Sequence, residues 1–381
     1  MNHSWNIKRL GDICTSELGK TRDEKRNKGS FRPYLCAVNV QWDKFELSEL
    51  KEMRFEDNEY DRYTIRKGDL VICEGGDIGR AAIWDKDEPI HYQNALHRVR
   101  FNEGVDSRFI LYYLYFLKQT GILDGRYGKG VTIKHLVKSS LLSIPVPVPP
   151  IDEQQRIVFE LDLLTDIIDK KNAQLRDLNS LIDALFFEMF GEAENNQKGF
   201  PVLSVNDVIE FQGGSQPDKK FFEYEPTDNN VRLIQIRDYK TDRYIIYVPK
   251  ALARRFCTEN DIMIGRYGPP IFQILKGISG AYNVALMKAI PKKGNIDFVR
   301  VFLRQKKLLH YLESFSRRVA GQDGIQMDKL KAYPFPYPPE ALQNSFARQY
   351  LDIEEQKKRI QSSLEEANLL LNSRMDYCFR Q

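Results

Sequence analysis

The chain contains an internal duplication, which restricts it to folds built from two similar units. Four segments of the first half recur in the second half in the same order, about 190 residues later. The matching pairs are LGDIC at 10–14 with VNDVI at 205–209, GDLVI at 68–72 with NDIMI at 260–264, GVTIKHL at 130–136 with GIQMDKL at 324–330, and IPVPVPP at 144–150 with YPFPYPP at 333–339. Short apolar patterns recur singly by chance, but an ordered set at a nearly constant offset does not. The chain is therefore predicted to fold as two related halves.

Each half combines strand and helix patterns before it reaches a proline pair. Short apolar runs such as DLVIC at 69–73 and DIMIG at 261–265 are typical of strands. The segments 109–119 and 297–315 carry apolar residues at helical spacing, and each is predicted as one amphipathic helix. The prolines at 149–150 and 338–339 end these mixed segments, because the residue before a proline is disfavoured in the helical region. We predict an α+β fold class with two globular mixed α/β domains.

The segment that follows each proline pair has the spacing of a coiled-coil helix. Ten positions spaced alternately by four and three residues run from Ile157 to Met189, and nine of them are apolar. The same spacing from Phe346 to Cys378 gives eight apolar positions of ten. Each series includes a lysine, Lys171 or Lys357, which either sets the register or extends to solvent. The predicted heptad stripe comprises Ile157, Leu161, Leu164, Ile168, Leu175, Leu178, Ile182, Leu185, Tyr350, Ile353, Ile360, Leu364 and Leu371.

The expected length of these helices implies that they need a partner. A helix of 40 residues extends roughly 60 Å and cannot cover its own apolar stripe. Acidic residues after Pro150 favour a helix start there, and Gly191 is expected to end the first helix. We expect the two helices to pair as an antiparallel coiled coil, which would give the molecule a pseudo-twofold internal repeat. The alternative is that the second helix lies on its own domain as a terminal brace.

Composition limits the class of protein and its compartment. A hydrophobic content of 42% excludes wholesale disorder, and a net charge of +4 is too small to prove a nucleic-acid partner. Five cysteines without a CxxC pair disfavour both a disulfide framework and a zinc site. The longest apolar run, 109–117, is shorter than the roughly 18 residues of a membrane helix. We therefore expect a cytoplasmic protein that does not enter a membrane.

The first proline junction is similar to a known protein family. The segment IPVPVPPIDEQQRIVFELD, which leads into a helix ending in FEMFGE, resembles the junction between recognition domain and spacer helix in the specificity (S) subunits of type I restriction-modification systems. The resemblance covers essentially the whole chain and is strong at this junction and at GVTIKHL. The second junction, PPEALQNSFARQY, lacks the Glu-Gln-Gln-Arg run, so its boundary is less well defined. The resemblance implies target recognition domain 1 at 1–150, spacer coiled-coil helix 1 at 151–191, target recognition domain 2 at 200–339 and spacer coiled-coil helix 2 at 340–381.

The resemblance also implies a non-catalytic DNA-recognition subunit of a multisubunit, ATP-dependent restriction endonuclease and adenine-N6 DNA methyltransferase. Each domain would recognise one half of a bipartite site in double-stranded DNA, and the helices would set the spacing of the halves. The helices would also bind two methylation (M) subunits, and restriction/translocase (R) subunits would complete the complex. No cofactor is expected in this subunit, because S-adenosylmethionine, ATP and Mg would be bound by the partners. A stiff rod suits a split site, because protein geometry sets half-site spacing.

Recognition of DNA needs cations that hold phosphates and side chains that reach base edges. In the first half, the segments 19–34 and 125–135 concentrate basic residues near glycines. In the second half, 265–268 and 316–326 offer arginine, tyrosine and glutamine side chains. Any one of these residues can instead be an ordinary solvated charge. The candidate DNA-binding residues are Lys20, Arg22, Lys25, Arg26, Lys28, Arg32, Arg126, Tyr127, Lys129, Lys134, Arg266, Tyr267, Arg317, Arg318, Gln322 and Gln326.

Motifs for catalysis are missing from the sequence. GRYGKG at 125–130 has glycine where a phosphate loop has serine or threonine, and there is no GxSxG elbow. The prolines at 269–270 lack the flanking residues of an amino-methyltransferase motif, and the five histidines are too scattered for a metal site. We predict no catalytic residue and no metal ligand. The alternative function is a coiled-coil scaffold protein that does not bind DNA.

Overall fold

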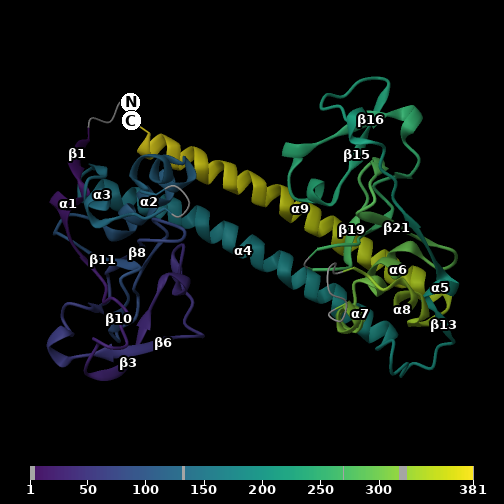
Figure 1. Ribbon diagram of the computed structural model, residues 1–381, viewed down its shortest axis with the longest axis horizontal. Helices are drawn as coiled ribbons and strands as arrows, with labels where there is room; N and C mark the ends of the chain where they lie inside the picture. The colour runs from purple at the N-terminus through teal and green to yellow at the C-terminus, as the bar shows by residue number, and fades with distance from the viewer. Residues whose placement is uncertain (1–4, 131–133, 269, 317–323, 381) are drawn as a thin grey trace. The chain divides into compact units, whose positions relative to one another are not determined.

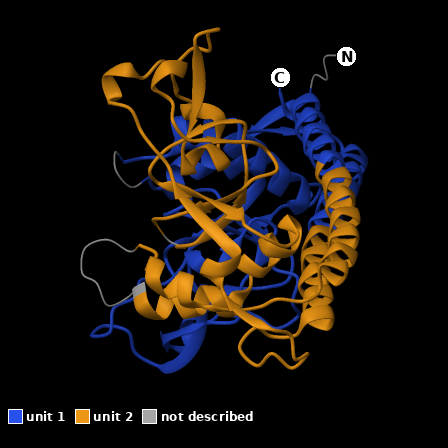
Figure 2. Ribbon diagram, turned by 90° about the vertical axis from the view of Figure 1, so that its right-hand side faces the viewer, with its two compact units in different colours: residues 1–172, 362–381 blue, residues 173–361 orange. Residues whose placement is uncertain are grey.

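The computed structural model describes residues 5–130, 134–268, 270–316 and 324–380. The chain forms two compact units, which Figure 1 shows by element and Figure 2 by colour. Unit 1 comprises Met1–Asn172 and Ser362–Gln381, and unit 2 comprises Ala173–Gln361. Each unit therefore contains one globular half of the chain together with parts of two long helices.

Unit 1 contains two four-stranded sheets, with the orders β2-β11-β8-β9 and β6-β3-β10-β7, and two small two-stranded sheets, β1-β12 and β4-β5. The strand β8 is buried along its whole length, as its uninterrupted apolar sequence requires. The strands are β1 (Asn6–Arg9), β2 (Cys14–Leu18), β3 (Ser30–Leu35), β4 (Val40–Gln41), β5 (Lys44–Phe45), β6 (Lys51–Phe55), β7 (Thr64–Ile65), β8 (Leu70–Cys73), β9 (Ala81–Ile83), β10 (Ile90–Tyr92), β11 (Leu96–Phe101) and β12 (Pro145–Val148). The short helices are α1 (Leu10–Ile13), α2 (Ser107–Gln119) and α3 (Lys138–Leu142).

Unit 2 contains the four-stranded sheets β14-β21-β18-β19 and β16-β15-β20-β17 and the two-stranded sheet β13-β22. Its strands are β13 (Val202–Ser204), β14 (Ile209–Gly213), β15 (Asn230–Ile234), β16 (Tyr247–Pro249), β17 (Phe256–Cys257), β18 (Ile262–Gly265), β19 (Gln273–Lys276), β20 (Gly280–Tyr282), β21 (Leu286–Pro291) and β22 (Pro334–Pro336). Its shorter helices are α5 (Val205–Val208), α6 (Ile296–Leu303), α7 (Lys306–Ser316) and α8 (Met327–Ala332).

The two units share one strand topology. When the strands of the four-stranded sheets are numbered along the chain, the sheet β2-β11-β8-β9 of unit 1 has the same order as β14-β21-β18-β19 of unit 2. The sheet β6-β3-β10-β7 likewise has the same order as β16-β15-β20-β17. Each unit also contains one parallel strand pair, β3 with β10 and β15 with β20, next to antiparallel neighbours. The duplication seen in the sequence is thus a duplication of architecture, and the predicted mixed α/β fold is confirmed.

Two long helices, α4 (Ile151–Phe190) and α9 (Glu340–Phe379), have 40 residues each. Helix α4 follows the first proline pair directly, and Gly191 comes after its last residue with a φ of 70°. Glycine adopts this left-handed conformation without steric cost, so it ends the helix as the sequence predicted.

The two long helices contact each other within each unit. In unit 1, Ile157 and Leu161 from the first part of α4 share a core with Leu371 and Met375 from the last part of α9. Glu160 of α4 also forms an ion pair with Arg374 of α9. In unit 2, the last part of α4 meets the first part of α9, and the rings of Phe186 and Phe346 lie 5.5 Å apart.

Each long helix ends in a phenylalanine that is inserted into the core of one unit. In unit 1, Phe379 of α9 contacts three aromatic residues of α2, including Phe109, at ring-centroid distances of 5.4–5.6 Å. In unit 2, Phe190 of α4 lies 4.7 Å from Phe298 of α6 and 5.4 Å from Phe346. Both terminal rings are 4% exposed. The core of unit 1 therefore includes the end of α9, the helix that follows the second globular half, and the core of unit 2 includes the end of α4, the helix that follows the first.

A buried glutamine fixes the start of each long helix. In unit 1, the Gln154 amide donates to the carbonyls of Pro149 and Gly104, while its oxygen accepts from the backbone N–H of Asp106. In unit 2, the Gln343 amide donates to the carbonyl of Pro338, and its oxygen accepts from the N–H of Asn295. The second junction, which the sequence left poorly defined, therefore repeats two of the three hydrogen bonds of the first.

One helix prediction was wrong. The segment 297–315 forms two helices, α6 and α7, with Arg304 and Gln305 between them. The backbone N–H groups of Arg304 and Gln305 donate to carbonyls three residues earlier, which tightens and ends α6. The break allows Phe298 and Leu308 to enter the same core from different helices. Among the described helices, none has the length and the hydropathy needed to cross a lipid bilayer.

Candidate nucleic-acid interface

The connection between β2 and β3, together with the start of β3, carries six of the predicted DNA-binding residues, but one of them is not available to a ligand. Lys20 is only 7% exposed, and its ammonium group forms an ion pair with Glu59. The same ammonium group lies 5.2 Å from the centre of the Phe55 ring. Lys20 therefore fixes this connection to the sheet β6-β3-β10-β7, which contains Phe55.

The other five predicted cations of this connection are exposed. The Asp23 carboxylate accepts hydrogen bonds from the backbone N–H groups of Lys25 and Arg26, which fixes the turn that presents them. Ion pairs there are weak because they are solvated, as in the 2.6 Å contact of Arg22 with Glu24. The exposed predicted cations are Arg22, Lys25, Arg26, Lys28 and Arg32. This surface suits phosphate contacts.

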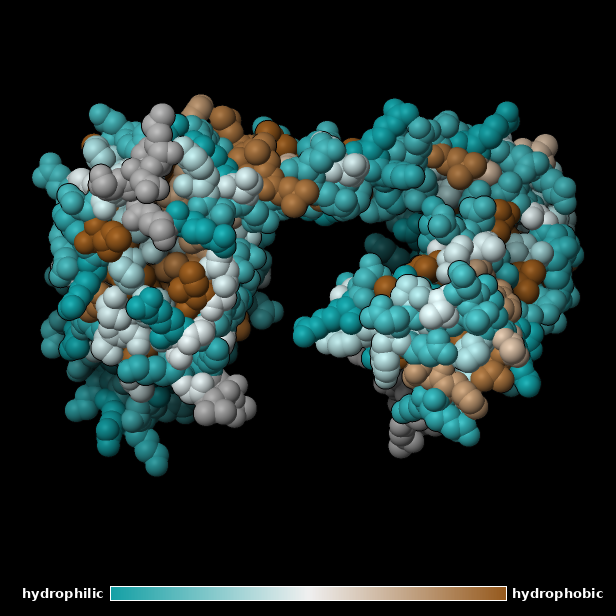
Figure 3. Space-filling view, turned by 90° about the horizontal axis from the view of Figure 1, so that it is seen from above, coloured by the Kyte–Doolittle hydropathy of each residue, from teal (hydrophilic) through white to brown (hydrophobic). Residues whose placement is uncertain are grey.

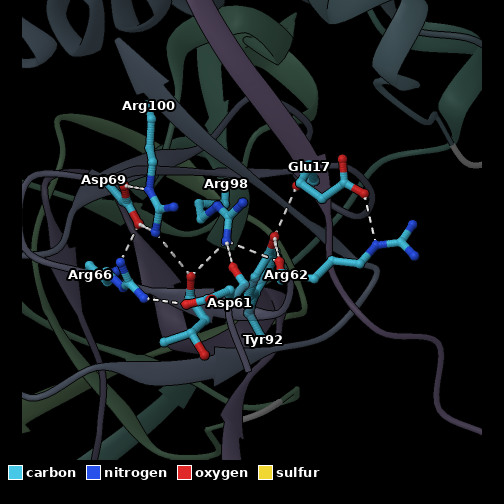
Figure 4. A network of polar contacts seen from close by, with 9 residues as sticks. Glu17, Asp61, Arg62, Arg66, Asp69, Tyr92, Arg98 and Arg100 are labelled. Carbon is cyan, nitrogen blue, oxygen red and sulfur yellow. Dashed lines mark hydrogen bonds and ion pairs between the residues drawn. The ribbon is translucent and has the colours of Figure 1, made fainter. Parts of the chain in front are cut away.

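The sheet beside this connection contains a network of charged groups that pair with one another (Figure 4). Arg100 donates two hydrogen bonds to the buried carboxylate of Asp69, at 2.7 and 3.0 Å. Arg98, on the same strand β11, donates to the backbone carbonyls of Asp61, Arg62 and Thr64 at 2.8–3.0 Å. These arginines secure the chain around residue 62 to the sheet, so their charge does not serve a ligand.

Glu17 of β2 closes the same network (Figure 4). Its carboxylate accepts from Arg62 at 3.1 Å and from Lys138 at 3.0 Å. Burial opposes ionisation of this carboxyl, but the two cations more than offset it and hold its pKa below the ordinary value. The Tyr92 hydroxyl donates to the Glu17 carbonyl at 3.2 Å. The Tyr282 hydroxyl makes the same bond to Gln212 in unit 2, also at 3.2 Å.

The segment 125–135 divides into structural and exposed residues. Tyr127 belongs to the core of unit 1, and Lys134 donates to the carbonyl of Asp124 at 2.7 Å. Arg126 and Lys129 are exposed, and the guanidinium of Arg126 lies 5.7 Å from the Tyr127 ring centre. Only these two residues of the predicted group present free charge to solvent. The intervening residues 131–133 lie outside the described part of the chain.

In unit 2, the predicted residues around the GRYG turn at 265–268 are partly exposed. Arg266 stacks 5.3 Å above the Tyr267 ring and donates to the carbonyl of Val284 at 3.3 Å. Tyr267 is 40% exposed. Gln326 is half-buried and donates to the carbonyl of Phe315, which gives it a structural role. The predicted residues Arg317, Arg318 and Gln322, like Pro269, lie outside the described residues.

The residues of the heptad stripe all lie on protected sides of the long helices. Ile157, Leu161, Ile182, Tyr350 and Ile353 are at most 7% exposed. The remaining members are buried or half-buried, and they are Leu164, Ile168, Leu175, Leu178, Leu185, Ile360, Leu364 and Leu371. Lys357 avoids an unpaired charge by contacting Glu354 at 2.5 Å.

A different set of apolar residues on these helices is exposed. Apolar side chains gather on the portion of the long helices that belongs to unit 1 (Figure 3). The exposed residues there are Phe159, Leu163 and Ile167 of α4 and Leu369, Leu370 and Tyr377 of α9. These residues lie outside the stripe with heptad spacing, so the heptad pattern did not predict them. Their spacing of four residues on α4 was the available signal.

A second basic segment, between β15 and β18, was also missed. It carries six exposed cations, Arg237, Lys240, Arg243, Lys250, Arg254 and Arg255. The density of lysine and arginine was visible in the sequence, but this stretch lacks the glycines that drew attention elsewhere. Among the described residues, no three or more His, Cys, Asp and Glu side chains are grouped as a metal site would require.

Comparison with protein families gives one match that covers the first globular half and most of α4. The model for the type I restriction modification DNA specificity domain matches residues 2–179. The type I restriction enzyme MjaIX specificity subunit of Methanocaldococcus jannaschii is 24% identical over 241 residues, which are 58% of this chain and 55% of that protein. The chain thus spans about half the length of that relative.

Two further relatives align over nearly the whole chain. The putative type I restriction enzyme MjaX specificity subunit of the same organism is 21% identical, covering 97% of this chain and 93% of that protein. The type I restriction enzyme EcoKI specificity subunit of Escherichia coli is 21% identical, covering 99% of this chain and 88% of that protein. Among solved structures, a type I restriction-modification S subunit from M. genitalium has a similar fold, with a TM-score of 0.56 at 13% identity over 98% of this chain and 96% of that one.

Proposed function

Since the chain belongs to the family of type I restriction-modification specificity subunits, we propose that each of its two units recognises one half of a bipartite DNA target. Specificity subunits are the non-catalytic part of these systems. The observation that carries the proposal is the duplicated strand topology, since two similar recognition units suit two half-sites. The alternative, a scaffold that does not bind DNA, is not favoured by these relationships.

Contacts to DNA would come from exposed cations at loops of the two units. In unit 1, Lys25, Arg26 and Lys28 are supported because they are exposed on an ordered turn. Arg126 and Lys129 form a second exposed pair in the same unit. In unit 2, Arg266 and Tyr267 are supported by their partial exposure. Lys20 and Tyr127 would instead maintain the fold.

The long helices would separate the units and bind partners. An antiparallel coiled coil along their whole length is supported by the contacts of opposite helix ends within each unit. Methylation subunits would dock on the exposed apolar residues of α4 and α9, because such patches mark protein interfaces. The partners would also bind S-adenosylmethionine, ATP and Mg, and restriction subunits would join this assembly in the cytoplasm.

Selection of DNA from a random pool tests this proposal. The chain is assembled with its methylation subunit, and the bound DNA is sequenced. We expect a motif of two short half-sites separated by a fixed gap. A variant with one heptad inserted after Asn172 in α4 and one after Gln361 in α9 lengthens each helix by about 10 Å. It should select the same half-sites with a longer gap.

The two arms test different parts of the proposal. Wild-type assembly that retains DNA without sequence selectivity would refute DNA recognition. An insertion variant that selects altered half-sites at the original gap would refute the role of the helices as a spacer.

A further inference from the structure

The two units carry their positive charge on different connections of the same fold. Between β2 and the end of β3, residues 19–35 hold six basic and two acidic residues. The matching residues 214–234 of unit 2 hold three basic and four acidic residues. In the connection that follows, up to the start of β8 in unit 1 and of β18 in unit 2, unit 2 has the larger excess of basic residues. Residues 36–69 of unit 1 hold six basic and nine acidic residues, whereas residues 235–261 of unit 2 hold six basic and four acidic residues.

Three of the four acidic residues of the unit 2 connection are already paired with cations outside it. Asp238 is buried and lies 3.5 Å from Arg232, and Asp242 contacts the same arginine at 3.1 Å. Asp261 forms an ion pair with Lys288 at 2.9 Å. In the described part of the chain, none of the six exposed cations of this connection pairs with a carboxylate. These cations outnumber the carboxylates of the connection and, apart from the electrostatic attraction between Arg237 and Asp238, are available to an anionic partner.

An exposed tyrosine gathers two of these cations. The Tyr244 ring is 48% exposed, and the guanidinium groups of Arg237 and Arg243 lie 5.3 and 5.6 Å from its centre. Arg237 belongs to the short helix η5 (Ile236–Tyr239), and Arg243 and Tyr244 belong to η6 (Asp242–Tyr244). Attraction between a guanidinium group and an aromatic ring limits the motion of both arginines. The ring thus holds two charges at one place on the surface.

This cluster is attached to the GRYG turn of unit 2. A Cβ atom at Gly265 would lie 2.7 Å from the Cδ1 atom of Ile236, so η5 packs directly on the end of β18. Arg266 follows Gly265 in the chain. Beneath the cluster, the Gln235 amide nitrogen, one Asp238 carboxylate oxygen and the Tyr239 hydroxyl are buried without a hydrogen-bond partner among the described residues. Such groups are costly in a folded protein, and ordered water or an ion commonly satisfies them.

We propose that unit 2 contacts the DNA backbone through the connection between β15 and β18, with Arg237 and Arg243 bound to phosphates. Tyr244 is a positioning residue that orients the two guanidinium groups. Unit 1 uses the connection between β2 and β3 for the same purpose, so the two similar units approach DNA through different loops. This inference rests on the proposed function, because it assumes that the units bind DNA.

The test measures DNA affinity of the chain assembled with its methylation subunit over a series of salt concentrations. Each lost phosphate contact lowers the slope of log affinity against log salt by about 0.9. The double variant Arg237→Gln/Arg243→Gln should therefore lower the slope by about two. The matched control is Lys44→Gln/Lys51→Gln, which removes two exposed cations from the corresponding connection of unit 1. It should leave the slope unchanged.

Tyr244 is tested by a conservative pair of variants. Tyr244→Leu removes the ring and should weaken binding about two- to fivefold, whereas Tyr244→Phe keeps the ring and should bind like the wild type. An unchanged salt slope in the arginine variant, with selective DNA binding intact in the wild type, would overturn this inference and leave the proposed function standing. A wild-type assembly that does not bind DNA selectively would refute the proposed function itself.

Discussion

Unit 1 and unit 2 have the same strand order, but their surfaces differ at three places. The first is the charge of the connections described above. The second is the β4-β5 hairpin of unit 1, where Trp42 packs edge-on against Tyr115 of α2 at 5.0 Å and Asp43 pairs with Arg108. Unit 2 has a groove of about 430 Å³ at the corresponding position, lined by Arg304 and Asp297. The framework of the fold thus tolerates different loops in its two copies.

The third difference lies on the long helices. Phe159, Leu163 and Ile167 are exposed on the part of α4 that belongs to unit 1. The corresponding positions of α9, in unit 2, are Arg348, Asp352 and Gln356. The two units therefore do not carry the same apolar residues at equivalent positions of their long-helix segments.

The largest expected effect concerns the terminal phenylalanines, which occupy equivalent places in the two units. Phe379→Ala should destabilise unit 1 and Phe190→Ala should destabilise unit 2, each by about 3–5 kcal/mol, because a buried ring leaves a cavity. Hydrogen exchange measured on peptides from α2 and α6 separates the two units. Phe187→Ala is the control, since this neighbouring ring is exposed. If each variant increased hydrogen exchange equally in the α2 and α6 peptides, the rings would not stabilise individual units.

A smaller effect is expected at the two helix starts. Gln154→Ala and Gln343→Ala each leave buried backbone groups without partners, which should cost about 2–3 kcal/mol. Gln154 also donates to the backbone carbonyl of Gly104, so its replacement leaves one more buried backbone group without a partner and should cost more. Urea unfolding with fluorescence detection measures both. Gln155→Ala, at an exposed neighbouring position, should have little effect. An equally large loss in that control would show that helix propensity, not the hydrogen bonds, is responsible.

The smallest effect depends on pH and distinguishes the units. Burial lowers the pKa of His97 in β11, whose ring also contacts the carbonyl of Leu136 at 2.7 Å, and Met287 occupies the corresponding place in unit 2. Because the unfolded histidine binds protons below about pH 6.5 and the buried one does not, acidification below that pH should destabilise unit 1. The slope is at most about 1.4 kcal/mol per pH unit.

His97→Met should reduce this acid sensitivity in unit 1 and leave unit 2 unchanged. His91 also has its pKa lowered by burial, so some dependence on pH should remain in the variant. Hydrogen exchange of each unit at pH 7 and pH 5.5 gives the measurement. An identical pH response in wild type and variant would mean that folding does not lower the pKa of His97.

The sequence by itself determined the duplication, the strands β8 and β18, the limits of the long helices and the stop at Gly191. These features follow from short periodic patterns and from the backbone preferences of proline and glycine, which act between neighbouring residues. The resemblance at the first proline junction then indicated the family before any contact was known.

Only the tertiary structure decided which charged and aromatic residues are free to bind. Lys20 is paired with Glu59, Lys134 contacts Asp124, and Tyr127 is in the core, although all three resemble surface residues in the sequence. The structure also divided 297–315 into two helices and revealed the exposed cations around Tyr244. Burial and ion pairing depend on residues that are distant in the chain and adjacent only after folding, so local patterns do not specify them.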